Sequence, residues 1–192
     1  MLLTVSLSAA LPLSAASHVD VVKMRTENQV NPLGIGTSTP RFSWQITSDR
    51  KGVVQTNYQI LVASSREKLD RNEADLWDSG ERNSDEQLWI PYQGKALLSG
   101  AQAYWKVRIT TNKGKSEWTE PQLFTIGLLG ETKWSGTWIG LEDLQPGEQK
   151  GMHTRLAARY IRKDFAAKGK VKRAVAYVAG LGVYEFYVNG QR

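Results

Sequence analysis

The chain has 192 residues, of which 41% are hydrophobic and 9% aromatic, with 25 basic and 19 acidic residues and a net charge of +6. This length fits one large or two small domains, and the aromatic content excludes a disordered composition. The absence of cysteine excludes a disulfide framework, a cysteine-based zinc site and a lipid-modified amino-terminal cysteine. Because basic and acidic residues are interspersed, we expect neither a nucleic-acid partner nor a membrane partner.

The first sixteen residues have the composition of a secretory signal peptide. Residues 1–16 carry no charged side chain and end in Ser14-Ala15-Ala16, the small residues that signal peptidase requires. The run is shorter than the roughly 20 apolar residues of a membrane-spanning helix. The usual basic residues at the start are absent. We expect cleavage after Ala16 and export to the periplasm or the cell exterior. The alternative is a buried amino-terminal strand.

Alternating patterns predict a series of short β-strands in the first ninety residues. A strand with one buried face has apolar side chains at every second position. The alternating sets are Val22-Met24-Thr26, Phe42-Trp44-Ile46 and Tyr58-Ile60-Val62. Further short strands are expected at 76–80 and 88–92, where Pro91 indicates an edge position. Between these strands, Ser64 and Glu67 have the spacing of a capping box, which predicts one or two helical turns.

The strongest pattern lies between residues 103 and 127. Two strand-like runs joined by a turn containing Gly114 predict a long hairpin, and its first run has an apolar face made of Trp105, Val107 and Ile109. A hairpin cannot bury its face alone, so the earlier strands must supply an opposing sheet. About seven strands without a long amphipathic helix predict an immunoglobulin- or fibronectin-III-like sandwich over residues 17–129.

A second β-rich region is expected over residues 130–192. Strand-like runs occur at 160–165, 173–179 and 183–188. Asn189-Gly190 is a strong signal for a type I′ hairpin turn, yet the sequence ends two residues later. We therefore expect an incomplete second sandwich, and a chain that is the front part of a longer protein. The alternative is a decayed gene product whose second half does not fold.

Six short segments of the first region occur in a specific order. They are Asn31-Pro32-Leu33-Gly34, Pro40-Arg41-Phe42-Ser43-Trp44, Tyr58-Gln59-Ile60-Leu61-Val62, Trp77-Asp78-Ser79-Gly80, Trp105-Lys106-Val107-Arg108 and Ser116-Glu117-Trp118-Thr119. Together they resemble the amino-terminal fibronectin-type-III-like module of bacterial α-L-rhamnosidases. The second region, at 138–140, 160–165 and 180–190, resembles the jelly-roll (galactose-binding-like) module that follows. Ala103 departs from the pattern, because fibronectin-III strands carry a tyrosine there; Tyr104 faces the other way, so a tyrosine corner is not expected.

This resemblance implies an all-β chain that is the non-catalytic front end of an exported α-L-rhamnosidase. Such an enzyme removes terminal rhamnose from plant glycosides or polysaccharides, and its catalysis belongs to a large helical (α/α)₆ barrel further along the polypeptide. The implied partners are that downstream catalytic domain and a rhamnose-containing glycan, and no cofactor is implied. The alternative is a stand-alone β-sandwich module that binds carbohydrate or protein.

No catalytic residue and no metal site are predicted within the chain. Inverting glycoside hydrolysis requires two carboxylates about 6.5–9.5 Å apart, one of them with a raised pKa. The acidic candidates all fall in expected loops and turns: Asp49, Glu81, Asp85, Glu86, Glu117 and Asp143. His18 and His153 are the only imidazoles, and with no cysteine and no histidine pair in the sequence neither is predicted to bind a metal or to act as a nucleophile.

Aromatic side chains are the candidates for sugar contact, because sugars pack on flat rings flanked by polar groups. Trp89 and Tyr92, on the expected edge strand, are the predicted carbohydrate-binding residues. The alternative places Trp89 in the sandwich or against a neighbouring domain. Five other tryptophans are predicted to be structural, with Trp44, Trp105 and Trp118 in the core and Trp134 and Trp138 at the junction between the domains.

Overall fold

The computed structural model describes residues 19–192, except 131–133, 141–143, 145, 149–150 and 152–156. The expected signal peptide at residues 1–16 lies outside the described residues, as do His18, Asp143 and His153. The chain forms two compact units, Met1–Ser135 and Gly136–Arg192, which divide a few residues beyond the predicted boundary at residue 129.

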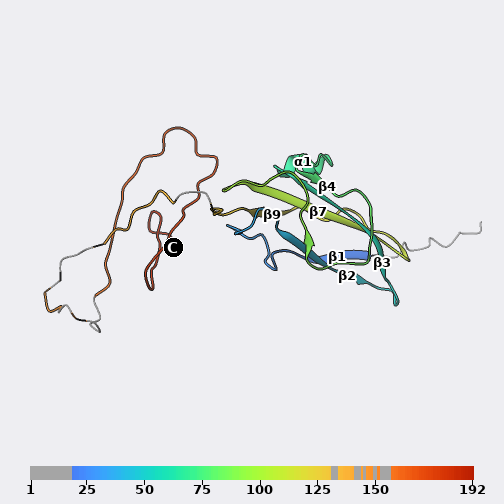
Figure 1. Ribbon diagram of the computed structural model, residues 1–192, viewed down its shortest axis with the longest axis horizontal. Helices are drawn as coiled ribbons and strands as arrows, with labels where there is room; N and C mark the ends of the chain where they lie inside the picture. Colours follow the sequence, from blue (N-terminus) through green and yellow to red (C-terminus); the bar gives the residue numbers. More distant parts are fainter. Residues whose placement is uncertain (1–18, 131–133, 141–143, 145, 149–150, 152–156) are drawn as a thin grey trace, which may run out of the picture. The chain divides into compact units, whose positions relative to one another are not determined.

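The first unit is built from two antiparallel sheets (Figure 1). The smaller sheet has the order β1-β2-β6, with strands Val19–Thr26, Arg41–Ser48 and Ile90–Pro91. The larger has the order β4-β3-β7-β8, with strands Trp77–Asp78, Gln55–Ala63, Gln102–Thr111 and Gly114–Lys115. Two more strands join it: β5 (Arg82–Asn83) pairs with β3, and β9 (Gln122–Thr125) pairs with β7. The all-β prediction for this region is confirmed, and β6 lies at a sheet edge as Pro91 indicated.

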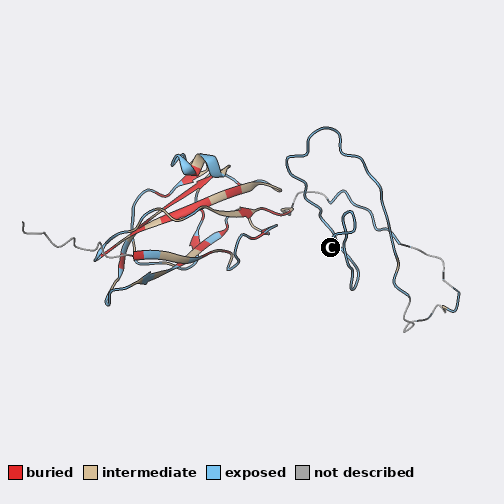
Figure 2. Ribbon diagram, turned by 180° about the vertical axis from the view of Figure 1, so that it is seen from behind, coloured by how far each residue is buried: buried red, intermediate tan, exposed pale blue. Residues whose placement is uncertain are grey.

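The hydrophobic core lies between the two sheets, and Figure 2 shows the buried residues along the strands of the first unit. The ring centroids of Phe42 on β2 and Trp105 on β7 are 4.4 Å apart, which joins the sheets at the centre. The core positions predicted for Trp44 and Trp105 are confirmed, since they are 1% and 0% exposed. Gly114, at the predicted turn, has a φ of +139°, which side chains rarely adopt.

Strand β1 differs from its prediction because it contains a bulge. The pairing of β1 with β2 shifts between Val22 and Arg25, and Lys23 has a left-handed φ of +51°. A bulge inserts one residue and exchanges the faces of the strand beyond it. Consequently Met24 is buried but Val22 is only half-buried, whereas Val21 packs against the core. The alternating pattern could not reveal this change of face.

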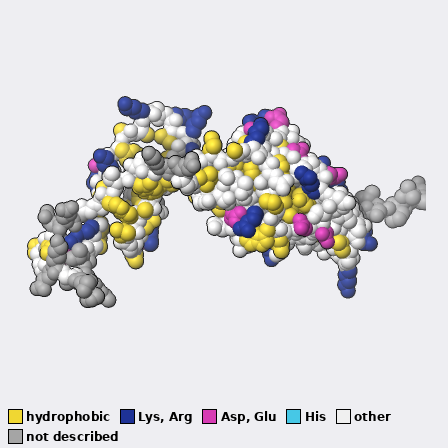
Figure 3. All heavy atoms as spheres, in the orientation of Figure 1, with side chains coloured by type: hydrophobic (Ala, Val, Ile, Leu, Met, Phe, Trp, Pro, Cys, Tyr) yellow, Lys and Arg dark blue, Asp and Glu magenta, His cyan; other side chains and the backbone are white. Residues whose placement is uncertain are grey.

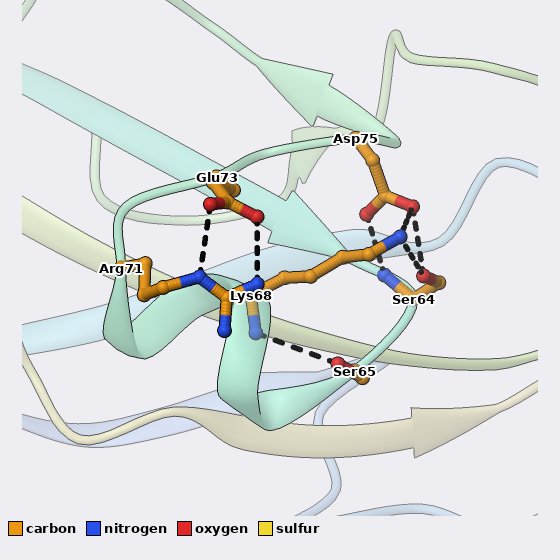
Figure 4. A network of polar contacts seen from close by, with 6 residues as sticks. All are labelled: Ser64, Ser65, Lys68, Arg71, Glu73 and Asp75. Carbon is orange, nitrogen blue, oxygen red and sulfur yellow. Dashed lines mark hydrogen bonds and ion pairs between the residues drawn. The ribbon is translucent and has the colours of Figure 1, made fainter.

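The short helix α1 (Arg66–Asp70) begins one residue later than predicted (Figure 4). Its N-cap is Ser65, whose hydroxyl accepts a hydrogen bond from the Lys68 backbone N–H at 3.4 Å. Ser64 instead binds Asp75, whose carboxylate accepts from the Ser64 backbone N–H and from the Lys68 ammonium, at 2.8 and 2.6 Å. Burial opposes ionisation of Asp75, but these bonds outweigh it and lower the pKa of Asp75 to about 2.

The prediction that Trp118 lies in the main core is wrong. Trp118 is half-buried on the outer face of the larger sheet, beside a small second cluster of buried residues that includes Leu69. Lys106 Nζ and Arg108 Cζ lie 5.1 and 4.5 Å from the centroid of its ring. Lys106 also donates to the Leu69 carbonyl and to Asn72 Oδ1, which ties α1 to β7. Cation–π packing therefore holds Trp118 where the sequence predicted apolar burial.

The second unit contains far less regular structure than predicted. In its described residues, the only β-pairing is an isolated bridge between Val188 and Gln191. The predicted turn is present, because Asn189 and Gly190 both have positive φ, +50° and +77°, as a type I′ turn requires. The runs at 160–165, 173–179 and 183–188 form no strands, and Figure 2 shows this unit exposed. A strand with one apolar face needs an opposing layer to be stable.

One buried polar network crosses the sandwich, and it should be sensitive to substitution. The Trp44 indole N–H donates to Gln55 Oε1 at 3.0 Å, and Gln55 Nε2 donates to the carbonyls of Ser84 and Glu86 at 3.0 and 2.9 Å. Gln55→Leu leaves all three partners unsatisfied, so we expect it to lower the free energy of unfolding by about 2–4 kcal/mol in urea denaturation.

The matched control for this substitution is Gln45→Leu, at an exposed position of β2. It should change the free energy of unfolding by no more than about 0.5 kcal/mol. Equal effects of the two substitutions would show that the Gln55 network does not carry the stability assigned to it.

Candidate functional site

The candidate site begins with the alternation of strand β2. Phe42 and Trp44 point into the core and are 0% and 1% exposed. Their neighbours Arg41 and Ser43 therefore lie on the outer face of the same strand. Strand β6 pairs with β2 at this point, with Arg41 opposite Pro91, and this pairing brings Trp89 beside the two polar residues.

Arg41 is held by a carboxylate from the end of β1. Glu27 Oε1 accepts from the Arg41 backbone N–H at 2.7 Å and from Arg41 Nε at 3.1 Å, while Glu27 Oε2 accepts from Arg41 Nη2 at 2.7 Å. Glu27 and Asn28 form a tight turn with φ values of +48° and +62°, closed by reciprocal backbone hydrogen bonds between Thr26 and Gln29. The carboxylate thus sits on a short turn that leaves it little freedom to move away.

This ion pair changes the titration of Glu27. The side-chain hydrogen bond from Arg41 is the largest influence and lowers the pKa of Glu27 below its ordinary value, although partial burial opposes the change. The same hydrogen bond raises the pKa of Arg41. Glu27 is therefore a fixed anion at neutral pH and a fixed hydrogen-bond acceptor.

Trp89 lies against this pair in an unusual backbone conformation. The guanidinium carbon of Arg41 lies 4.3 Å from the ring centroid, and Trp89 as a whole remains 46% exposed. The Trp89 backbone N–H donates to Ser43 Oγ at 2.9 Å. Its φ of +58° is left-handed, which is strained for a bulky side chain.

An open hollow of about 420 Å³ adjoins the ion pair. It is lined by Glu27, Gln29, Pro32, Leu33, Gly34, Ile35, Gly36 and Thr37. Leu33 is among these lining residues and is 78% exposed, so the hollow has an apolar side chain as well as polar groups. The loop that forms it is anchored on β9: the Ile35 N–H donates to the Thr125 carbonyl at 2.8 Å, and the Gly34 N–H donates to Thr125 Oγ1 at 2.8 Å.

Tyr92, the second predicted sugar-binding residue, is not on this surface. It is 3% exposed, and its ring packs edge-on against Trp77 with centroids 5.4 Å apart. Its hydroxyl donates to the Lys95 carbonyl at 2.7 Å. Burial, followed by the negative charge of Asp75, raises the pKa of Tyr92 to about 12. Because strand alternation and the edge pairing of β6 turn Tyr92 inward and Trp89 outward, the structure does not bring the predicted pair together.

The structure offers no catalytic constellation in its described part. The five described acidic candidates, Asp49, Glu81, Asp85, Glu86 and Glu117, are all exposed. The buried polar and charged residues of the described part are Thr26, Gln55, Ser79, Lys106 and Thr111, none of them acidic. The least exposed carboxylate in the ion pairs of the described residues is that of Glu148, whose side chain is 9% exposed and is paired with Arg159. In the same residues, no three His, Cys, Asp or Glu side chains are grouped to hold a metal ion. None of the described helices has the length and apolar character needed to cross a bilayer.

The surface charges of the first unit are mixed in sign. Figure 3 shows basic and acidic side chains interspersed on the visible face of the first unit, with hydrophobic side chains between them. Four exposed Lys or Arg side chains of this unit are paired with acidic ones: Arg41, Arg66, Arg71 and Lys115. Paired charges of this kind do not form the continuous basic stripe of a nucleic-acid interface.

Comparison with known proteins identifies the first unit. Residues 21–130 match the family model described as the Rha78A-like, N-terminal immunoglobulin domain. An α-L-rhamnosidase of Formosa agariphila is 35% identical over 191 residues, covering 92% of this chain and 20% of that protein. An α-L-rhamnosidase of Alteromonas sp. is 35% identical over 167 residues, covering 86% of this chain and 18% of the relative. The chain thus spans about a fifth of the length of these relatives.

Solved structures agree with this assignment. The α-L-rhamnosidase of Streptomyces avermitilis, determined in complex with L-rhamnose, has a TM-score of 0.60 and 36% identity, covering 64% of this chain and 12% of that one. The α-L-rhamnosidase from Dictyoglumus thermophilum has a TM-score of 0.60 and 34% identity, covering 65% of this chain and 14% of that one.

The Glu27–Arg41 pair should make stability depend on acidity. Because the pKa of Glu27 is lower in the folded state than its ordinary value of 4.5, its contribution is present above about pH 4.5. That contribution is lost as pH falls through the folded pKa. We expect wild-type protein to lose up to about 1 kcal/mol more stability than Glu27→Gln between pH 5 and pH 3, measured by urea unfolding.

Arg41→Leu is the control for this measurement. It removes the partner of Glu27 and should abolish the same part of the pH dependence. Parallel pH profiles for the wild type and Glu27→Gln would contradict the pairing.

The left-handed backbone of Trp89 predicts an unusual order of stability between two variants. Trp89→Gly and Trp89→Ala both delete the ring, but only glycine adopts a φ near +58° without steric strain. We expect the glycine variant to be the more stable by about 1 kcal/mol, measured as a shift in the urea midpoint. If the alanine variant were the more stable, Trp89 would have an ordinary negative φ.

Proposed function

The chain belongs to the family of Rha78A-like N-terminal immunoglobulin domains, and from this membership we propose that it is the non-catalytic amino-terminal part of an exported α-L-rhamnosidase. The parent enzyme would remove terminal rhamnose from plant glycosides or polysaccharides. The observation that carries this proposal is the match of residues 21–130 to the family model, together with relatives that are themselves α-L-rhamnosidases.

The geometry of the described residues supports the non-catalytic part of the proposal. Glycoside hydrolysis requires one carboxyl group with a raised pKa, which in proteins comes from burial. Every described acidic residue with a clearly shifted pKa has it lowered, by hydrogen bonds that stabilise the ionised form: Glu27, Glu67, Glu73, Asp75 and Glu81. Carboxylates of this type do not donate a proton at neutral pH. The chemistry is assigned to the catalytic domain of the same polypeptide.

The second unit is assigned to a jelly-roll sandwich of the parent enzyme. The match to the Formosa agariphila relative covers 92% of the chain, so it includes most of residues 131–192. Tyr184, Phe186 and Val188 alternate along the last run and are 53%, 46% and 47% exposed. An alternating apolar face of this kind is stable when a further layer of the parent enzyme covers it.

Export is proposed from the composition of residues 1–16, which are apolar or small and end in Ser-Ala-Ala. The cleaved chain would then begin shortly before β1. In the exported enzyme, the first unit would pack against the catalytic domain and help to present its substrate. The exposed Trp134 and Trp138, at 49% and 69%, are the proposed contacts at the domain junction.

A second candidate function, carbohydrate binding by the sandwich itself, is favoured by one observation. Trp89 is 46% exposed beside a fixed Arg41–Glu27 pair, which gives an aromatic platform with polar neighbours. This arrangement is compatible with a role in the parent enzyme, because a module can both bind glycan and belong to a hydrolase.

The proposed function predicts a clear result in an enzyme assay. The purified chain should release no chromophore from an aryl α-L-rhamnoside, because it lacks an acid–base carboxylate pair among its described residues. In contrast, a chimera in which this chain replaces the matching fifth of the Formosa agariphila α-L-rhamnosidase should hydrolyse the same compound.

The control is the same relative with the matching segment deleted, which should be inactive or insoluble. Turnover by the isolated chain would contradict the proposal. So would a chimera that behaves like the deletion variant, because a true front-end module should substitute for its homologue.

A further inference from the structure

We propose that Asn189 is a site of spontaneous covalent modification, at which an aspartate or an isoaspartate replaces the asparagine. The Gly190 backbone nitrogen attacks the Asn189 Cγ, and a bond between these two atoms forms. The bond from Cγ to the side-chain nitrogen breaks, and ammonia leaves with the proton of the Gly190 N–H. Water then opens the cyclic imide at either of its carbonyls, which restores the backbone N–H and gives isoaspartate or aspartate. The reaction needs no reagent besides water.

Both reacting groups are accessible. Asn189 and Gly190 are exposed, and neither the Asn189 side chain nor the Gly190 N–H makes a hydrogen bond to another described residue. Glycine has no Cβ that would hinder the approach to its nitrogen. Apart from its two chain neighbours, nothing lies within 4 Å of the position that a Cβ would take at Gly190. The attack therefore meets neither a competing hydrogen bond nor a steric barrier.

The turn that contains these residues is held by few contacts. Val188 and Gln191 exchange two backbone hydrogen bonds of 2.8 and 3.0 Å, and this isolated bridge has no further strand beside it. While the turn is closed, the left-handed φ values of +50° at Asn189 and +77° at Gly190 fix the backbone. The side chain must leave this arrangement to meet the nitrogen. A turn with so little pairing opens at low cost, because local opening requires less free energy where fewer contacts are lost.

Four asparagines of the first unit lack a free nitrogen at the following residue. The backbone N–H groups that follow Asn28, Asn72 and Asn112 each donate a hydrogen bond within that unit. Asn31 precedes Pro32, whose nitrogen carries no proton. The first step of the reaction is thus blocked at Asn31 and opposed by an existing hydrogen bond at the other three.

The remaining two asparagines are held in a sheet. Asn57 on β3 lies opposite Asn83 on β5, so the backbone of either residue must leave this pairing before its side chain can react. Asn83 precedes the small residue Ser84, which makes it the nearest competitor of Asn189. Serine still carries a Cβ beside its nitrogen, whereas Gly190 does not.

The modification would alter the hairpin as well as its charge. An isoaspartate passes the main chain through the former side chain and so adds one methylene to the backbone of the turn. The Val188–Gln191 bridge depends on a turn of two residues, and a longer turn no longer brings its two hydrogen bonds into register. Asn189 thus connects the age of the chain to the structure of its last hairpin.

The test incubates the full chain at neutral and at mildly alkaline pH, followed by tryptic digestion and mass spectrometry with separation of the aspartyl and isoaspartyl peptides. Asn189 is the one asparagine of the tryptic peptide 174–192. We expect this peptide to gain the mass difference between –NH₂ and –OH at least about tenfold faster than any other asparagine peptide. Both products should form, and the rate should rise with pH because the attacking nitrogen must lose its proton.

Two variants separate the chemistry from the opening of the turn. Gly190→Ala strains a backbone with a φ of +77° and so favours the open turn, yet its Cβ should slow the reaction severalfold. Asn189→Gln should abolish the modification of this peptide, because a longer side chain must close a larger ring. The matched control is Asn83→Gln, which should leave the rate at Asn189 unchanged.

Several molar urea supplies a measurement that needs no variant. Urea should speed the reaction at Asn83 severalfold, because it dissolves the pairing of β3 with β5, and it should change the rate at Asn189 by less than about threefold. A faster reaction at Asn83 than at Asn189 in the folded chain would overturn the proposal. So would a strong acceleration of Asn189 by urea, or a Gly190→Ala variant that reacts as fast as the wild type.

Discussion

The contact between the rings of Phe42 and Trp105 is the interaction on which the rest of the first unit depends. It joins the middle of the smaller sheet to the middle of the larger one, at a centroid separation of 4.4 Å. Phe42 also meets Trp77, Tyr92 and Phe124, so one side chain holds three further strands or loops against the core. The Trp105 indole N–H is buried without a hydrogen-bond partner, a cost that the packing of its large ring offsets.

The contact between Phe42 and Trp105 also determines which side chains of β2 face water. Because side chains alternate along a strand, burying Phe42 and Trp44 forces Arg41 and Ser43 outward. Those two residues then orient Trp89, one through a stacked guanidinium and the other through a backbone hydrogen bond. The core and the candidate glycan site are thus consequences of one register. A shift in the pairing register of β2 by a single residue would turn Arg41 into the core, and Trp89 would lose its contacts with Arg41 and Ser43.

The opposite sheet uses the same chemistry for a structural purpose. There Lys106 and Arg108 stack on Trp118, and the Lys106 ammonium also binds carbonyl and amide oxygens at the end of helix α1. Lys106 is 5% exposed, and burial lowers its pKa although nearby acidic residues oppose this. Arg108 donates to Gln59 Oε1 from both Nε and Nη2, so both cations are also held by oxygen acceptors of the protein. Trp89 and Trp118 therefore differ in the groups that surround their rings.

Much of the first unit could be predicted because strand alternation is a local property. Phe42, Trp44, Trp105 and the turn at Gly114 follow from neighbours in the sequence. The bulge at Lys23 could not be predicted, because its cause is the pairing of β1 with β2, nor could the burial of Tyr92, which depends on loop packing against Leu76 and Lys95.

For the candidate site, Trp89 was identified from sequence, whereas its partners were not. Arg41 could have been placed on the outer face from its position beside Phe42. Glu27 could not, since only the hairpin of β1 and β2 brings it to Arg41, fourteen positions later in the chain. More strands were predicted in the second unit than its described residues form. Its alternating runs are typical of strands with one apolar face, and such strands need an opposing layer that the described residues do not supply.

The central claim is that one register of β2 builds both the core and the Trp89 surface, and a single nuclear Overhauser spectrum of the folded chain tests it. The account predicts cross-peaks between the ring protons of Phe42 and Trp105 and, in the same spectrum, between the Trp89 ring and the side-chain protons of Arg41. Cross-peaks from Arg41 to the core rings, or a Trp89 ring in contact with Phe42, would contradict it.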